Sequence, residues 1–321
     1  MQIIYNNGIE ISDGKTVLYL DPKRKANNAF ISHAHTDHIS GSGIATSETN
    51  EIIKYRRKKY EGINAAYYRP MRIEDLEVEL YPAGHVLGSA MIRVNDVLYT
   101  GDFNTEGCHS CDAAHPKKCK TLIIDSTYGL PEFKFPQKKV VIEDLISWVK
   151  HETSKHGVII GAYEFGKAQE IIAHLQELNI PVYASENIVK IAEIYNKFGH
   201  ALNCMPINDI VKEEKMIGNR QQFIILLPLS KLRSEFVYNL RRSGVRTAYV
   251  SGWCLKYSFN VDAQFPLSDH ADFEQLIRFV QGCNPERVFT FGGYAAQFAE
   301  YLKKILDINA STILSNHFER P

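Results

Sequence analysis

The stretch FISHAHTDHISG, Phe30–Gly41, places three histidines and one aspartate within six residues. The apolar residues that open it predict the end of a short buried strand. Alternate residues of an extended strand face the same way, so His33 and His35 can reach one metal ion. Asp37 and His38, in the turn that follows, can reach a second position close by. A polar surface loop is the alternative, but this four-residue pattern rarely arises by chance.

Further ligands are expected at other strand ends, because one cluster cannot complete two coordination spheres. His85 lies in the glycine-rich loop of YPAGHVLGSA, and Asp102 lies at the strand end in YTGDF. Asp21 ends the strand LYLD and is better placed to orient a ligand than to bind an ion directly. Imidazole and carboxylate together suit zinc, with manganese or iron as possibilities, so we expect a centre of one or two ions.

The composition is that of an ordinary globular chain, with 45% hydrophobic and 23% charged residues among 321. The formal net charge is zero, so a nucleic-acid partner would have to meet a local basic surface. No apolar run approaches the roughly 20 residues that span a bilayer. The start, MQIIYNNGIE, lacks the pattern of a secretory signal. We therefore expect a cytoplasmic protein without a membrane partner, whose six cysteines are thiols or metal ligands.

The organisation of the chain changes near residue 136. The residues before it are rich in strands that end on an acid, such as KTLIIDSTYG, Lys120–Gly129. After it, apolar strand runs such as VIIGAY, Val158–Tyr163, alternate with helical faces, which predicts a parallel sheet with helical crossovers. The last stretch can return to the first domain. We expect a discontinuous domain of residues 1–135 and 255–321, and an inserted domain of residues 136–254.

The order of these motifs, with HxHxDH after a strand and then GH and GD, resembles the metallo-β-lactamase superfamily. The resemblance implies an αββα sandwich with metals at the strand ends. It implies one ion held by His33, His35 and His85, and another held by Asp37, His38 and Asp102, with Asp102 bridging. In such a centre a metal-held water loses its proton near neutral pH and attacks the substrate, and Asp37 can hold or deprotonate that water.

Two later motifs resemble the β-CASP branch of this superfamily, a group of nucleases with an α/β domain inserted in the sandwich. They are LIIDSTYG, which contains Asp125, and PLSDHADFEQL, which contains His270. Each residue has a simpler alternative as a helix or loop cap. The resemblance implies that His270 offsets phosphate charge or protonates the leaving oxygen, and that Asp125 orients His270 or a metal ligand.

Over nearly the whole chain, the motifs GDFN, YEFGKAQ, SGW and LSDHADF resemble the ligase-associated DNA exonucleases of bacteria and archaea. The resemblance implies a nuclease that degrades single-stranded or frayed DNA from an end, with DNA-repair or ligase partners by family association only. Phe291 stands where RNA-cleaving members carry a metal-binding histidine, so the second ion lacks a ligand and DNA is favoured over RNA. His317 could substitute, although an exposed terminal histidine is the simpler interpretation.

Two alternatives use the same metal motif. One is an RNA-processing exo- or endonuclease of the β-CASP type, and the other is a small-molecule metallohydrolase such as a lactonase or thioesterase. A nucleic-acid-binding protein that has lost catalysis is disfavoured by the intact ligand set.

Several further residues are candidates for binding. Lys167 begins a helix and is either a phosphate ligand or a solvated lysine, and Ser89 and Ser268 are additional candidate substrate contacts. The basic run Lys54–Tyr60 is either a solvated helix face or a ridge that binds a nucleic-acid strand. Cys108, Cys111 and Cys119 form either a structural zinc site or a group of thiols.

Overall fold

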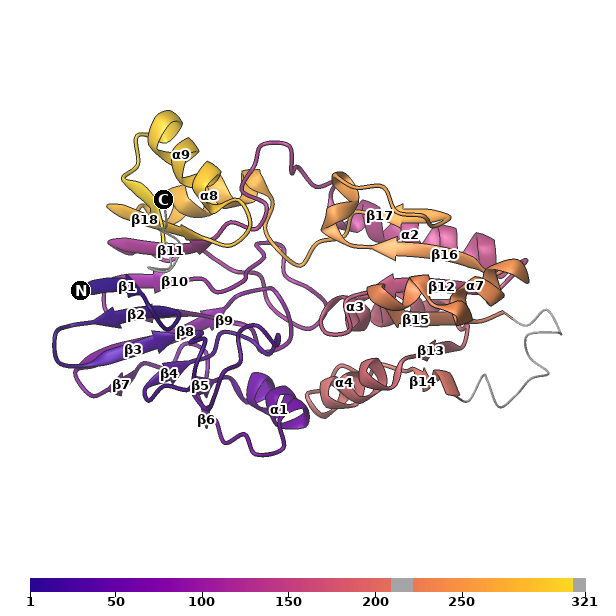
Figure 1. Ribbon diagram of the computed structural model, residues 1–321, viewed down its shortest axis with the longest axis horizontal. Coiled ribbons are helices and arrows are strands. Elements are labelled where there is room, and N and C mark those ends of the chain that lie inside the picture. The colour runs from indigo at the N-terminus through magenta and orange to yellow at the C-terminus, as the bar shows by residue number, and fades with distance from the viewer. Residues whose placement is uncertain (209–221, 314–321) are drawn as a thin grey trace. The chain divides into compact units, whose positions relative to one another are not determined.

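The computed structural model describes residues 1–208 and 222–313. The chain divides into two compact units, one made of Met1–Lys134 and His270–Pro321 and the other of Phe135–Asp269 (Figure 1). Among the described residues, no helix combines the length and apolar character needed to cross a membrane.

The first unit contains two sheets. One has the strand order β1 (Gln2–Tyr5), β2 (Ile9–Ser12), β3 (Val17–Leu20), β4 (Ala29–Phe30), β5 (Ile44–Ala45) and β6 (Ile63–Asn64). The other has the order β19 (Ala310–Thr312), β18 (Arg287–Phe291), β11 (Thr121–Asp125), β10 (Val97–Tyr99), β9 (Ala90–Val94), β8 (Leu76–Pro82) and β7 (Met71–Ile73). Apolar side chains from both sheets form one core between them.

Helices cover the outer faces of the two sheets. In β11, Ile123 faces the core between the sheets, whereas Leu122 and Ile124 join the core formed with α8 (Phe273–Cys283) and α9 (Ala295–Leu306). Successive strand residues point to opposite faces, so a strand that is buried on both sides is a continuous apolar run. On the other side, α1 (Ser47–Arg56) packs against β6. The predicted αββα sandwich is confirmed.

Three neighbouring parallel strands bring polar residues to one edge of the second sheet. Strands β10, β11 and β18 run parallel, and Asp125 at the end of β11 lies opposite Phe291 at the end of β18. Asp102 follows β10 by a few residues. The carboxyl ends of parallel strands share an edge, so residues that are far apart in the sequence meet there.

The second unit is a parallel sheet with helical crossovers, as the sequence pattern predicts. Its strand order is β14 (Met205–Pro206), β13 (Val182–Ala184), β15 (Ile224–Pro228), β12 (Val158–Ala162), β16 (Arg246–Val250) and β17 (Ala263–Phe265). Its helices include α2 (Lys138–Thr153), α3 (Lys167–Leu175), α4 (Glu186–Lys197) and α7 (Glu235–Arg242).

The boundary predicted at residue 255 needs correction. Residues 255–269 belong to the second unit, and the chain enters the first unit again at His270. The reason is β17, a strand of three residues that pairs in parallel with β16 and extends the sheet of the second unit. Its sequence, AQF, is too short and too polar to stand out as a strand.

Candidate metal centre

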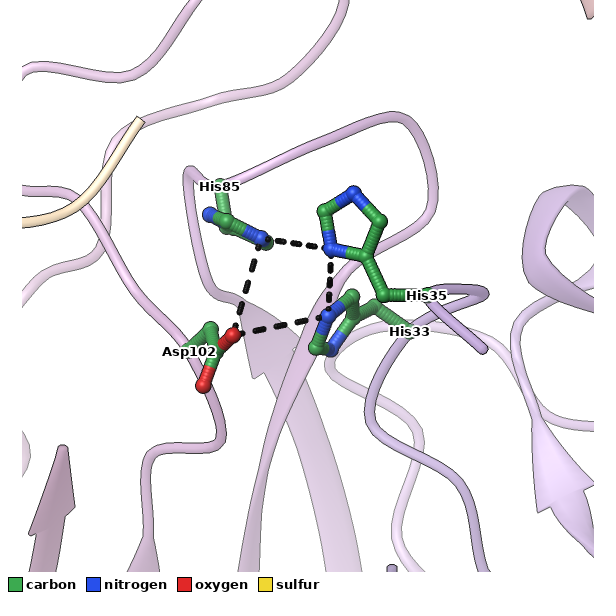
Figure 2. Close-up of side chains that lie close together, drawn as sticks. All are labelled: His33, His35, His85 and Asp102. Atoms are coloured by element: carbon green, nitrogen blue, oxygen red, sulfur yellow. Dashed lines mark hydrogen bonds and ion pairs between the residues drawn. The ribbon is translucent and has the colours of Figure 1, made fainter. Parts of the chain in front are cut away.

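Three histidine rings and one carboxylate converge in the first unit (Figure 2). His33 Nε2 lies 2.9 Å from His35 Nδ1, and His85 Nε2 lies 3.2 Å from the same atom. Asp102 Oδ2 lies 3.6 Å from His33 Nε2 and 3.8 Å from His85 Nε2. Ligands placed tetrahedrally around zinc at about 2.0–2.1 Å are about 3.3 Å apart. The observed spacings therefore fit one ion.

The protonation of His33 also suits metal binding. Its ring is fully buried, and burial, followed by the charge of His38 and the neighbouring histidines, lowers its pKa well below the usual value. The ring is therefore neutral at physiological pH, which is the form that donates a lone pair to a metal.

Asp37 and His38 adjoin Asp102 and form with it a second group of candidate ligand atoms, and Asp125 and His270 also lie close enough to Asp102 to hold an ion with it. His38 Nε2 lies 3.6 Å from Asp102 Oδ2 and 3.6 Å from Asp37 Oδ2. Burial lowers the pKa of His38, but the Asp102 and Asp21 carboxylates outweigh it and raise the pKa to about 9. His38 therefore holds a second proton at neutral pH, and a metal ion that bound to this ring would have to displace it. Asp102 Oδ2 is common to both groups, and its role as a bridging ligand stays a prediction.

Asp21 supports a histidine of each group. Its Oδ2 accepts hydrogen bonds from His38 Nδ1 at 2.8 Å, from Ser32 Oγ at 2.6 Å and from Tyr99 Oη at 2.8 Å. Ser32 Oγ in turn lies 2.9 Å from His33 Nδ1. A carboxylate that accepts from Nδ1 keeps a proton on that nitrogen, so a metal that displaced the other proton of His38 would be bound by Nε2. Among the described residues, Asp21 belongs to neither group that could hold an ion, and its orienting role stays a prediction.

The loop that carries four of the candidate ligands is held by two arginines at the end of α1. We define residues Ser32–Ile39 as the ligand loop. Arg56 Nη1 donates to the Ala34 carbonyl at 2.7 Å, and Arg57 donates to the Ile39 carbonyl. The sequence predicted only a solvated face or a strand-binding ridge for this basic run. No local pattern indicates that arginines after a helix reach carbonyls far back along the chain.

Asp125 and His270 form a pair beside these ligands. His270 Nδ1 lies 2.9 Å from Asp125 Oδ2, and the His270 ring centroid lies 4.6 Å from that of His85. Thr127 donates to Asp125 Oδ1 from its amide at 2.9 Å and its hydroxyl at 2.7 Å. The helix-cap alternative for His270 does not apply, because Asp272 is the N-cap of α8 and accepts from Gln275 N.

Phe291 lines a pocket next to the second group. Its ring lies 5.3 Å from that of Tyr99. The pocket has a volume of about 540 Å³ and includes Asp37, His38, Asp102 and Asp125 in its lining. Its size lies in the range of small-ligand sites. The residue that departs from the RNA-cleaving pattern therefore faces the candidate metal position. His317, the proposed substitute ligand, lies outside the described residues.

Two predicted substrate contacts have other partners. Ser89 is buried, and its hydroxyl accepts from the amides of His85 at 3.1 Å and Val86 at 3.1 Å, so it supports the His85 loop instead of facing a substrate. Lys167 is only 1% exposed, and its Nζ lies 2.5 Å from Asp269 Oδ1. In both cases the printed hydrogen bonds run to groups of the chain itself.

The Lys167 ammonium belongs to a buried ion network inside the second unit. It lies 3.5 Å from Glu170 Oε2, and Lys138 Nζ lies 2.5 Å from Glu170 Oε1. Two cations and two carboxylates therefore balance each other there. This corrects the phosphate-ligand interpretation of Lys167. Ser268, half-buried in the same unit, stays a predicted contact.

The cysteines do not assemble a zinc site in the part of the chain that the structure describes. The Sγ atoms of Cys108 and Cys111 lie 2.7 Å apart, but neither residue belongs to a group of three or more candidate ligands. Cys119 lies beside Cys283, whose thiol is the main cause of a raised Cys119 pKa. The thiol interpretation is therefore favoured.

Comparison with known proteins gives relatives but no matching family model. A probable DNA ligase from Opitutus terrae is 31% identical over 300 residues, which covers 89% of this chain and 29% of the relative. An RNase J-like protein from Methanocaldococcus jannaschii is 29% identical over 203 residues, 55% of this chain and 48% of the relative. The DNA cross-link repair protein SNM1 of Arabidopsis thaliana is 24% identical over 307 residues, 81% of this chain and 59% of the relative. The chain thus spans less than two thirds of each of these proteins.

Proposed function

Because the chain belongs to the β-CASP branch of the metallo-β-lactamase superfamily, we propose that it is a metal-dependent nuclease that hydrolyses phosphodiester bonds. The observation that carries the proposal is the Asp125–His270 pair next to the metal ligands. Ligands alone suffice for many metallohydrolase reactions, whereas an oriented histidine beside them adds a donor for a leaving alkoxide. A small-molecule metallohydrolase is the less supported alternative.

The donor set supports zinc. Three imidazole nitrogens and one carboxylate oxygen, spaced to fit a tetrahedral ion, are typical of zinc, and manganese is the next candidate. We assign His33, His35 and His85 to one ion, and Asp37, His38 and Asp102 to a second. When bound, such ions lower the pKa of water and withdraw charge from phosphoryl oxygens.

The chain's own groups then move the protons. The Asp37 side chain is 75% exposed and can accept the proton of the attacking water. His270 has its Nδ1 fixed by Asp125, so its Nε2 is the nitrogen that donates to the leaving oxygen or to a phosphate oxygen. Asp125 acts through His270, whose ring orientation and tautomer it sets.

We propose single-stranded or frayed DNA, cleaved from an end, as the substrate. The pocket beside the centre has Phe291 in its lining and is large enough for about one nucleotide. The names of two relatives refer to DNA, as a ligase and as a cross-link repair protein, which also makes DNA-repair or ligase partners a proposal. RNA is the second candidate, because another relative is named RNase J-like.

Labelled DNA and RNA oligonucleotides with 5′-phosphate, 5′-hydroxyl or blocked ends test this proposal directly. We expect shortening of DNA from an unblocked end, and a loss of turnover of about 10²–10⁴-fold in His270→Ala with metal content unchanged. His115→Ala, at an exposed histidine of the first unit, is the matched control and should cleave normally. Cleavage of RNA but not of DNA would show that the substrate is RNA. A fully active His270→Ala variant would refute the proposed role of His270 in catalysis.

A further inference from the structure

A groove in the second unit lies outside the metal centre and shares no residue with it. It has a volume of about 780 Å³ and is lined by the 3-10 turn Leu229–Arg233, by α7, by Tyr249 of β16 and by residues 259–261. All these residues belong to Phe135–Asp269, so the groove is complete within one unit.

Aromatic rings form part of its wall. Tyr249 and Phe259 stack with their ring centroids 3.7 Å apart and their planes 6° from parallel. Tyr238 on α7 is 61% exposed although it is a large aromatic residue. A wall of rings held by mutual stacking loses little conformational freedom when a further planar group stacks on it.

Two arginines line the same groove. Arg241 Nη1 donates to the Asn260 carbonyl at 3.3 Å, which ties this guanidinium to the groove wall. Arg233 lines the groove together with the stacked rings of Tyr249 and Phe259. None of the described residues that line the groove is acidic. The groove therefore combines positive charge with aromatic surface.

We propose that this groove binds a single-stranded segment of nucleic acid, with a base stacked on Tyr238 and phosphates paired with Arg233 and Arg241. Nucleic acid supplies both the anions and the flat faces that the groove offers, and only an unpaired strand exposes its bases for stacking. The choice of a nucleic-acid strand rests on the proposed function. The added inference is a binding site on the inserted unit, separate from the point of cleavage.

Binding is measured in an Asp37→Asn background, which prevents cleavage, with a fluorescein-labelled strand of about 30 nucleotides. Tyr238→Ala should weaken binding about tenfold, because the base no longer has a ring to stack on. Arg233→Glu should weaken binding and lower the slope of log affinity against log salt by about 0.7 for each phosphate that is no longer neutralised. Arg242→Glu makes the same charge change at an exposed position of α7 outside the groove, and should change affinity by less than about twofold at ~0.15 M salt.

Photocross-linking locates the strand. A strand that carries 5-bromodeoxyuridine should cross-link to the peptide containing Tyr238, and mass spectrometry identifies that peptide. Equal reductions in affinity in Arg233→Glu and Arg242→Glu, without this cross-link, would overturn the proposal, because binding would then depend only on general charge. Groove-dependent binding by a wild-type protein that cleaves nothing would keep this site and refute the nuclease. Cleavage by a protein whose binding does not depend on the groove would support the nuclease and refute this binding site.

Discussion

Replacing Asp21 with asparagine separates the support of the metal centre from its ligands. The carboxylate accepts four hydrogen bonds, three at Oδ2 and one at Oδ1 from the Ser32 amide at 2.7 Å. It meets His38 directly and His33 through Ser32. One buried side chain therefore orients a ligand of each metal position, and a single isosteric substitution should weaken both.

The expected size follows from the number of donors. Asparagine has one accepting oxygen and one NH₂ group, so in either orientation at least one of the four donors faces another donor. A buried donor without an acceptor costs about 1–3 kcal/mol. If His38 is the donor affected, its tautomer is no longer fixed with Nε2 unprotonated. We expect Asp21→Asn to bind zinc about 10–100-fold more weakly, which is the usual effect of removing a group that orients a ligand.

Competition with a chromophoric chelator measures this change in zinc affinity. Tyr99→Phe is the matched control, because it removes one hydrogen bond to the same Asp21 oxygen and touches no ligand. It should lower the free energy of unfolding by about 1 kcal/mol and change zinc affinity far less than Asp21→Asn does. Wild-type zinc affinity in Asp21→Asn, or an equal reduction in Tyr99→Phe, would refute this account of how the histidines are held.

The other predictions concern occupancy, loop position and stability. Phe291→His adds an imidazole beside the second metal position and should raise the metal-to-protein ratio, measured by elemental analysis; an unchanged ratio would show that the position is already full. Arg56→Ala removes an anchor of the ligand loop and should weaken zinc binding about tenfold, whereas the exposed Lys58→Ala should leave zinc affinity unchanged. Equal zinc affinities in the two variants would show that Arg56 does not hold the ligand loop. Lys167→Met leaves the Asp269 carboxylate buried without its ammonium and should lower the free energy of unfolding by about 3–5 kcal/mol, and a decrease below about 1 kcal/mol in urea denaturation would contradict the buried ion network.

The parts of the structure that local rules govern were predictable. His33, His35, Asp37 and His38 are close in sequence, so the geometry of a strand and its turn is enough to bring their side chains together. The buried strands were also readable, because strands covered on both faces have uninterrupted apolar runs. His270 needed the resemblance to a family, since 145 residues separate it from Asp125. The metal-binding and catalytic roles of these residues stay predictions.

The parts set by tertiary packing were not predictable. Lys167 follows a glycine at a helix start, which favours phosphate binding. Only the three-dimensional structure shows that its ammonium already pairs with the Asp269 carboxylate. Ser89 looks like an exposed loop serine until its two backbone donors are known. The support of the ligand loop by Arg56 likewise depends on where α1 ends in space. For Lys167 and Arg56 the partner lies at a sequence distance that no periodicity encodes, whereas the partners of Ser89 lie three and four residues away in an irregular loop.

The position of Asp102 Oδ2 has a consequence for how the proposed two-ion centre would fill. This one oxygen lies 3.6 Å from His33 of one group and 3.6 Å from His38 of the other. Two ions that share a ligand atom cannot fill independently, because the first to arrive changes the charge and the proton balance that the second encounters. Loading would then be sequential, and a sample with half its full metal content would consist mainly of molecules that hold one ion. Activity plotted against added metal should curve instead of rising in a straight line.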